Sequence, residues 1–102
     1  MEKSIVRKEV FLCVGDKKYI YTLPVFPDKI FLDEINKLGN LKEIKTRKGI
    51  VWLLENQESM MLRFGEKSKD LVVSFQRKSF KEAISSLDKF LTEYFHLSIA
   101  ED

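Results

Sequence analysis

The side chains that most often carry out catalysis are few in this chain, and their spacing favours no reaction. His96 is the only histidine and lies near the end of a predicted helix, where we expect a boundary or surface residue rather than a general base. Cys13 is the only cysteine, and no neighbour in the sequence would stabilise its thiolate. Asp33 and Glu34 are adjacent on a predicted helix and therefore point apart. We predict that the protein is not an enzyme.

Metal and cofactor sites also lack their usual residue patterns. A structural metal site needs clustered histidines and cysteines, and this chain has one of each. All four glycines are isolated, so no glycine-rich loop is available to hold a phosphate group. We therefore predict no metal and no cofactor.

The composition predicts a single domain in a reducing compartment. The 102 residues, of which 44% are hydrophobic and 33% charged, suffice for one core. A lone cysteine is typical of the cell interior, and residues 1–8 carry charges where a signal peptide needs an apolar stretch. No run approaches the roughly 20 apolar residues of a membrane span. We expect residues 1–102 to form one cytoplasmic domain with no membrane partner.

Basic side chains gather in the middle of the chain and offer one binding chemistry. The candidates are Lys42, Lys45, Arg47, Lys48 and Arg63. Cations on a sheet can follow a phosphate backbone while aromatic rings stack on the bases. Two other interpretations stay open: the lysines protect a strand edge from aggregation, and the neighbouring Trp52 belongs to the core.

Turn residues divide the chain into strands and two helices. A two-residue turn at Gly15-Asp16 predicts a hairpin of the segments Ser4–Val14 and Lys17–Phe26. Asp28 is a suitable N-cap for a helix over Lys29–Leu38. Four further strands are predicted over Leu41–Arg47, Ile50–Glu55, Ser59–Phe64 and Leu71–Gln76, and a final helix runs from Ser79 to Tyr94. The order ββαββββα predicts an α+β fold with a mainly antiparallel sheet.

The two halves of the chain share a faint repeat. The segment Phe11–Lys17 resembles Met61–Lys67, and each leads through a turn into a second apolar strand and then a helix. The helices carry apolar residues at similar spacing: Phe31, Ile35 and Leu38 in one, Phe80, Ile84 and Leu87 in the other. We interpret the domain as two pseudo-repeated strand-strand-helix units, in halves of about 1–47 and 48–102. Duplication and the recurrence of a favoured motif both remain open as the cause.

Alternation along the strands assigns two faces to the predicted sheet. We expect the helices to cover the face with Val10, Leu12, Val14, Met60, Leu62, Phe64, Tyr19, Tyr21, Leu23, Leu71, Val73 and Phe75. The other face would hold Phe11, Cys13, Ile20, Thr22, Met61, Arg63, Val72 and Ser74. This second face is too apolar for a solvated surface, so the other half of the chain, a second subunit or a partner should cover it.

The apolar second face leads to the main functional hypothesis. We predict a protein-interaction module that binds a partner segment in the groove between its halves or along a strand edge. The predicted partner-binding residues are Phe11, Ile20, Met61, Arg63 and Val72. A homodimer would use the same surface. The alternative is sequence-tolerant nucleic-acid binding through the basic residues named above.

Two resemblances accompany these hypotheses. The predicted ββββα order between Leu41 and Tyr94 resembles the repeat of PC4-like and Whirly-like single-strand binders, in element order alone. The short chain, rich in Lys, Ile and Phe and without a functional motif, resembles small orphan proteins of filamentous viruses of hyperthermophilic archaea. That second likeness concerns overall character and implies a small interaction module in a host cytoplasm.

Overall fold

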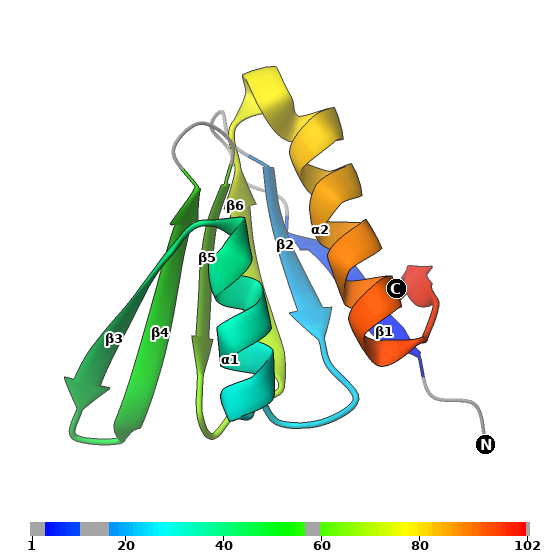
Figure 1. Cartoon of the computed structure of the whole chain (residues 1–102). Helices are drawn as coiled ribbons and strands as arrows, with labels where there is room; N and C mark the ends of the chain where they lie inside the picture. Colours follow the sequence, from blue (N-terminus) through cyan, green and yellow to red (C-terminus); the bar gives the residue numbers. More distant parts are fainter. Residues whose placement is uncertain (1–3, 11–16, 57–59, 102) are drawn as a thin grey trace.

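A single sheet organises this protein, with both helices on one of its faces (Figure 1). The structure is a computed structural model that describes residues 4–10, 17–56 and 60–101. The strands are β1 (Ile5–Val10), β2 (Lys17–Thr22), β3 (Asn40–Thr46), β4 (Gly49–Asn56), β5 (Met60–Gly65), β6 (Asp70–Phe75) and β7 (Ile99–Glu101). Their order in the sheet is β3-β4-β5-β6-β2-β1-β7, and every neighbouring pair is antiparallel except β1 and β7. The predicted α+β class with a mainly antiparallel sheet is confirmed.

The two helices form where the sequence predicts them. Helix α1 (Lys29–Ile35) begins after Asp28, whose carboxylate accepts a hydrogen bond from the Phe31 N–H at 2.9 Å. A 3-10 turn over Asn36–Leu38 continues it. Helix α2 (Phe80–Phe95) follows a second 3-10 turn over Arg77–Ser79.

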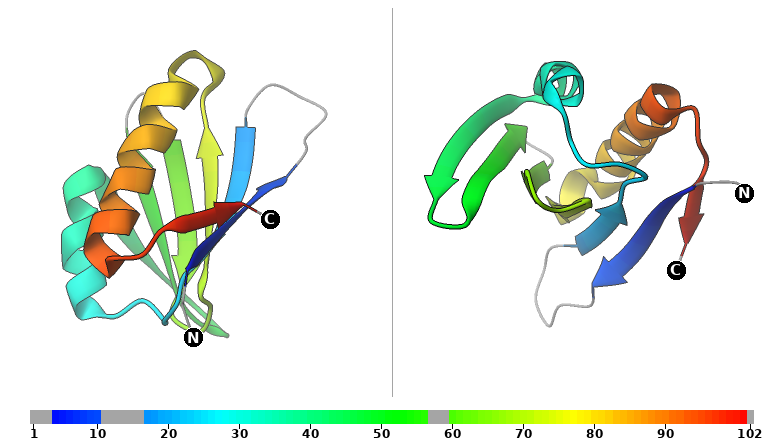
Figure 2. Two further views of the ribbon diagram at one scale, coloured as in Figure 1. Left: turned by 90° about the vertical axis from the view of Figure 1, so that its right-hand side faces the viewer. Right: turned by 90° about the horizontal axis from the view of Figure 1, so that it is seen from below.

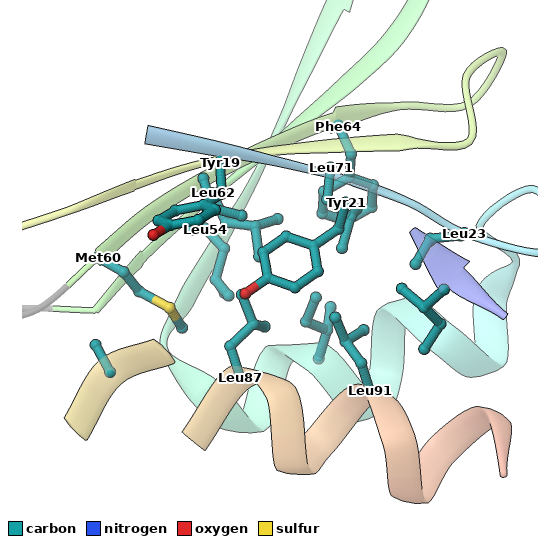
Figure 3. Close-up of a cluster of buried hydrophobic side chains, with 14 of the residues drawn as sticks. Tyr19, Tyr21, Leu23, Leu54, Met60, Leu62, Phe64, Leu71, Leu87 and Leu91 are labelled. Atoms are coloured by element: carbon teal, nitrogen blue, oxygen red, sulfur yellow. The ribbon is translucent and has the colours of Figure 1, made fainter. Parts of the chain in front are cut away.

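The core lies between the sheet and the helices. Ala83, Leu87 and Leu91 form the buried stripe of α2, because residues four apart share one side of a helix. Figure 3 shows Leu87 and Leu91 facing the side chains that the strands direct toward the helices, with the Tyr21 ring between them and the sheet. The strand residues in this layer include Tyr19, Tyr21, Trp52, Leu54, Met60, Leu62, Phe64, Leu71, Val73 and Phe75.

The C-terminal strand β7 is absent from the predicted order ββαββββα, which is therefore wrong at this end. The strand has three residues and pairs in parallel with the first residues of β1, and Figure 2 shows it beside that strand. The Ile5 N–H donates to the Ser98 carbonyl at 3.0 Å, and the Arg7 guanidinium pairs with the Glu101 carboxylate. So short a segment has no readable alternation, and its pairing with β1 is a tertiary contact.

The register of β1 also differs from the prediction. A two-residue turn at Gly15-Asp16 would place Cys13 opposite Lys18, whereas the structure places Val10 there. This odd shift turns Val10 to the face away from the helices and Ile5 into the core. The predicted turn, Leu12 and Val14 lie outside the described residues. A strand with apolar residues on both faces specifies its register weakly, which explains the error.

The structure does not confirm the pseudo-repeat. Strands β2 and β6, one from each predicted unit, lie side by side with Tyr19 opposite Val73 and Tyr21 opposite Leu71, as a two-fold relation would require. The outer strands break that relation. Met60 lies opposite Phe75, but its counterpart Val10 lies opposite Lys18, five positions before Leu23, the counterpart of Phe75.

Candidate functional site

The face of the sheet opposite the helices is the candidate site, and we call it the open face. Its central row crosses six neighbouring strands, because residues paired across antiparallel strands point to the same side. The row runs Lys42, Leu53, Arg63, Val72, Ile20, Lys8. Apolar side chains thus occupy the middle of the row, with Arg63 among them and a lysine at each end.

Two hollows lie on either side of this row. One, of about 400 Å³, is lined by Arg63 and Val72 together with Val51 and Asp70. The other, of about 420 Å³, is lined by residues of the adjacent row, among them Asn40, Glu55, Met61 and Ser74. Met61 is 47% exposed, a large value for an apolar side chain. The open face therefore combines apolar side chains with shallow depressions into which a partner's side chains can fit.

Cations outnumber carboxylates on the open face. Its charged residues are Lys8, Lys18, Lys42, Arg63, Glu55 and Asp70. The Thr22 hydroxyl donates to the Asp70 carboxylate at 2.8 Å. None of the four cations forms an ion pair within residues 4–10, 17–56 and 60–101. These positive charges remain available to an acidic group from outside the chain.

The predicted partner-binding residues come together on this face. Ile20 lies opposite Val72, Val72 lies opposite Arg63, and Met61 is two positions before Arg63 on β5. Phe11 lies outside the described residues. The fold therefore makes one surface of four predicted residues, although 52 positions of the sequence separate Ile20 from Val72.

The basic residues of the alternative hypothesis do not share one surface. Lys42 and Arg63 are both on the open face, with Leu53 between them. Lys45 points to the opposite side of β3, and Arg47 and Lys48 form the turn between β3 and β4.

Aromatic side chains of the described strands point away from the open face. Trp52 is 7% exposed and packs against Phe64, with ring centroids 5.4 Å apart, which confirms that it belongs to the core. Tyr19 and Tyr21 also lie under the helices. Among the described strand residues, the open face therefore has cations but no ring on which a base could stack.

Several residues of this surface were not predicted from the sequence. Val51 and Leu53 lie within the run Ile50–Leu54, which is apolar throughout and gives no sign of which residues face the helices. The error in the β1 register hid Lys8, whereas Lys18 alternates with Ile20 on β2 and could have been assigned to this face. Strict alternation from the buried Trp52 would have placed Val51 and Leu53 on the open face.

A polar cluster on the helix face is the second place where charged groups meet. The Tyr21 hydroxyl donates to the Asp88 carboxylate at 2.7 Å, and Arg7 binds both Asp88 and Glu101. Burial and the hydrogen bond to Asp88 raise the pKa of Tyr21 above its ordinary value, so this hydroxyl remains a donor. The cluster joins β1, β2, β7 and α2, and its groups bind one another. We interpret it as a structural link.

The remaining candidates for chemistry are dispersed. His96 is exposed at the end of α2, where its φ of 55° places it in the left-handed conformation. Glu34 pairs with Lys37 at 3.0 Å, and Asp33 is exposed on α1. Cys13 is outside the described residues. The part of the chain that the structure describes contains no group of three metal-binding side chains and no helix that could cross a membrane.

Comparisons of the chain with protein-family models, curated proteins and solved structures find no match. The fold itself defines the class: an α+β protein whose mostly antiparallel sheet is covered by helices on one face only. Function must therefore be argued from the uncovered surface.

Proposed function

We propose that this protein is a non-enzymatic interaction module that binds a segment of a protein partner on the open face of its sheet. The observation that carries the proposal is the row from Leu53 through Arg63 and Val72 to Ile20, which neither helix covers. The exposed Met61 lies beside it. Binding interfaces favour apolar residues, methionine and arginine. A sheet face that contacts only solvent carries mainly polar side chains instead.

The charges and dimensions of the row suggest the chemistry of the partner. Lys42 and Lys8 mark the two ends of the row, and Arg63 lies within it. Six strands at a spacing of about 4.8 Å span about 24 Å, which an α-helix of about 16 residues would match. We therefore expect an amphipathic, acidic segment whose apolar side chains contact the middle of the row.

We expect the partner to bind on the surface that spans the two predicted halves, rather than in a groove between them. Strands β2 and β6, which belong to different halves, pair directly over six positions. Val72 and Ile20 lie on either side of this junction. A segment bound along the row would therefore contact both halves.

Selection of binding peptides from a random library tests the proposal directly. Peptides displayed on phage and selected against the wild-type protein should be enriched in acidic and apolar residues. Titration calorimetry should show that Arg63→Glu weakens their binding by about tenfold or more, because attraction becomes repulsion at the centre of the row. Lys89→Glu, an exposed change on α2, is the matched control. Equal binding by Arg63→Glu and wild type would reject the proposal.

Nucleic-acid binding is a second candidate, favoured by the four cations of the open face, which form no ion pair with any residue that the structure describes. Fluorescence anisotropy with labelled single- and double-stranded oligonucleotides at two salt concentrations tests it. Micromolar binding that falls steeply with salt, and that Lys42→Glu weakens, would support this function. No binding at low salt would exclude it. The resemblance to viral proteins adds the expectation that either partner is met in a host cytoplasm.

A further inference from the structure

Strand β3 is the uncovered edge of the sheet. At the opposite edge, the three-residue β7 covers part of β1, whereas β3 has a neighbour on one side only and both helices lie over strands further in (Figure 1). It has seven residues, Asn40–Thr46, whereas β7 at the other edge has three. An edge of this length presents a row of backbone donors and acceptors to another strand.

Hydrogen bonding shows which residues of β3 present these groups. The Leu41 N–H donates to the Asn36 side chain at 3.3 Å, so the backbone of Leu41 points away from β4. Alternate residues share this direction, which places the backbone groups of Glu43 and Lys45 on the outer side as well. No residue within 4–10, 17–56 or 60–101 outside the sheet bonds to them. Glu43 and Lys45, which have opposite charges and outward-pointing backbone groups, therefore flank Ile44.

We propose that β3 pairs in antiparallel orientation with β3 of a second copy of this chain, with Ile44 on the two-fold axis. This register places Glu43 of each copy opposite Lys45 of the other, so the dimer gains two complementary charge pairs. It also places the two Ile44 side chains, each 46% exposed, against one another. The bond between Asn36 and Leu41 limits the new ladder to Lys42–Thr46.

The charges of β3 exclude the neighbouring registers. A two-fold axis at Glu43 would place the Glu43 carboxylates of the two copies opposite each other. An axis at Lys42 or at Lys45 would place the same lysine of the two copies opposite each other. Like charges directly opposite one another destabilise a sheet. The same residues that hinder unspecific aggregation thus permit one self-pairing. Because the axis is perpendicular to the sheet, both open faces lie on the same side of the dimer and form one wider surface.

Sedimentation analysis of the full chain tests this proposal with a charge swap. The wild type should be a dimer at micromolar concentration, against a chain mass of 12.0 kDa. Glu43→Lys and Lys45→Glu should each weaken the dimer by about tenfold or more, since each creates like-charged pairs. The double variant Glu43→Lys/Lys45→Glu should restore it. A monomeric wild type, or a dimer unaffected by both single changes, would overturn the proposal.

Cysteine cross-linking tests the register. In a Cys13→Ser background, Ile44→Cys should form an intermolecular disulfide under mild oxidation, because the two side chains meet at the axis. Lys45→Cys is the matched control and should cross-link much less, because its opposite residue is Glu43. Equal cross-linking of both variants would reject the Ile44-centred register. Arg63 lies on β5, and β4 separates it from β3, so Arg63→Glu should leave the dimer intact, which separates this test from that of the open face.

Discussion

The two faces of the sheet are built from alternate residues of the same strands, yet they differ in almost every physical property. On β5, Leu62 is fully buried under the helices, while its neighbours Met61 and Arg63 are exposed. On β6, Val73 is likewise fully buried and Val72 is not. Apolar strand residues occur on both faces, although the open face also carries charged side chains. The position of the helices, rather than the chemistry of the strand, decides which apolar residues stabilise the fold and which remain available for binding.

Truncation of neighbouring residues on β5 should show the largest contrast between the faces. Leu62→Ala should lower the free energy of unfolding by about 3 kcal/mol, because it leaves a cavity in the core. Met61→Ala should change it by less than about 0.5 kcal/mol, because its side chain is exposed. Urea unfolding at neutral pH measures both values. Comparable losses at the two positions would contradict the division of the sheet into a stabilising and a binding face.

The polar cluster tests whether the helix face depends on apolar contacts alone. Asp88→Asn removes the charge that pairs with Arg7 while keeping an acceptor for the Tyr21 hydroxyl. The Arg7 side chain is 16% exposed, and we expect a loss of about 2 kcal/mol in the free energy of unfolding. Glu93→Gln, an exposed carboxylate on the same helix, is the control and should cost less than about 0.5 kcal/mol. Equal effects would mean that the cluster does not stabilise the fold.

The smallest expected effect is a dependence of stability on alkaline pH. The raised pKa of Tyr21 means that, above pH 10, the unfolded chain releases the tyrosine proton before the folded chain does. The free energy of unfolding of the wild type should therefore fall as the pH rises above that value, by about 1 kcal/mol per unit more than in Tyr21→Phe. Below pH 9 the two proteins should show the same pH dependence. Parallel curves up to pH 11 would show that Tyr21 ionises equally in both states.

The parts of the fold that could be predicted carry strong local signals. The stripe Ala83, Leu87, Leu91 has helical spacing, Asp28 is an effective N-cap, and short turns join β3 to β4 and β5 to β6. The candidate site was partly predictable for the same reason. Once β5 and β6 were recognised, alternation placed Arg63 and Val72 on the side away from Leu62 and Val73.

The sequence by itself thus determined the class of fold, the helices and the faces of the central strands, because periodicity and turn residues act over a few positions. Only the tertiary structure decided the register of β1 and the addition of β7. It also decided the order of the strands, which brings Ile20 beside Val72 and leaves β3 at an edge. These features depend on pairing between segments far apart in the chain. Their energies come from the complete sheet and core, which no local pattern records.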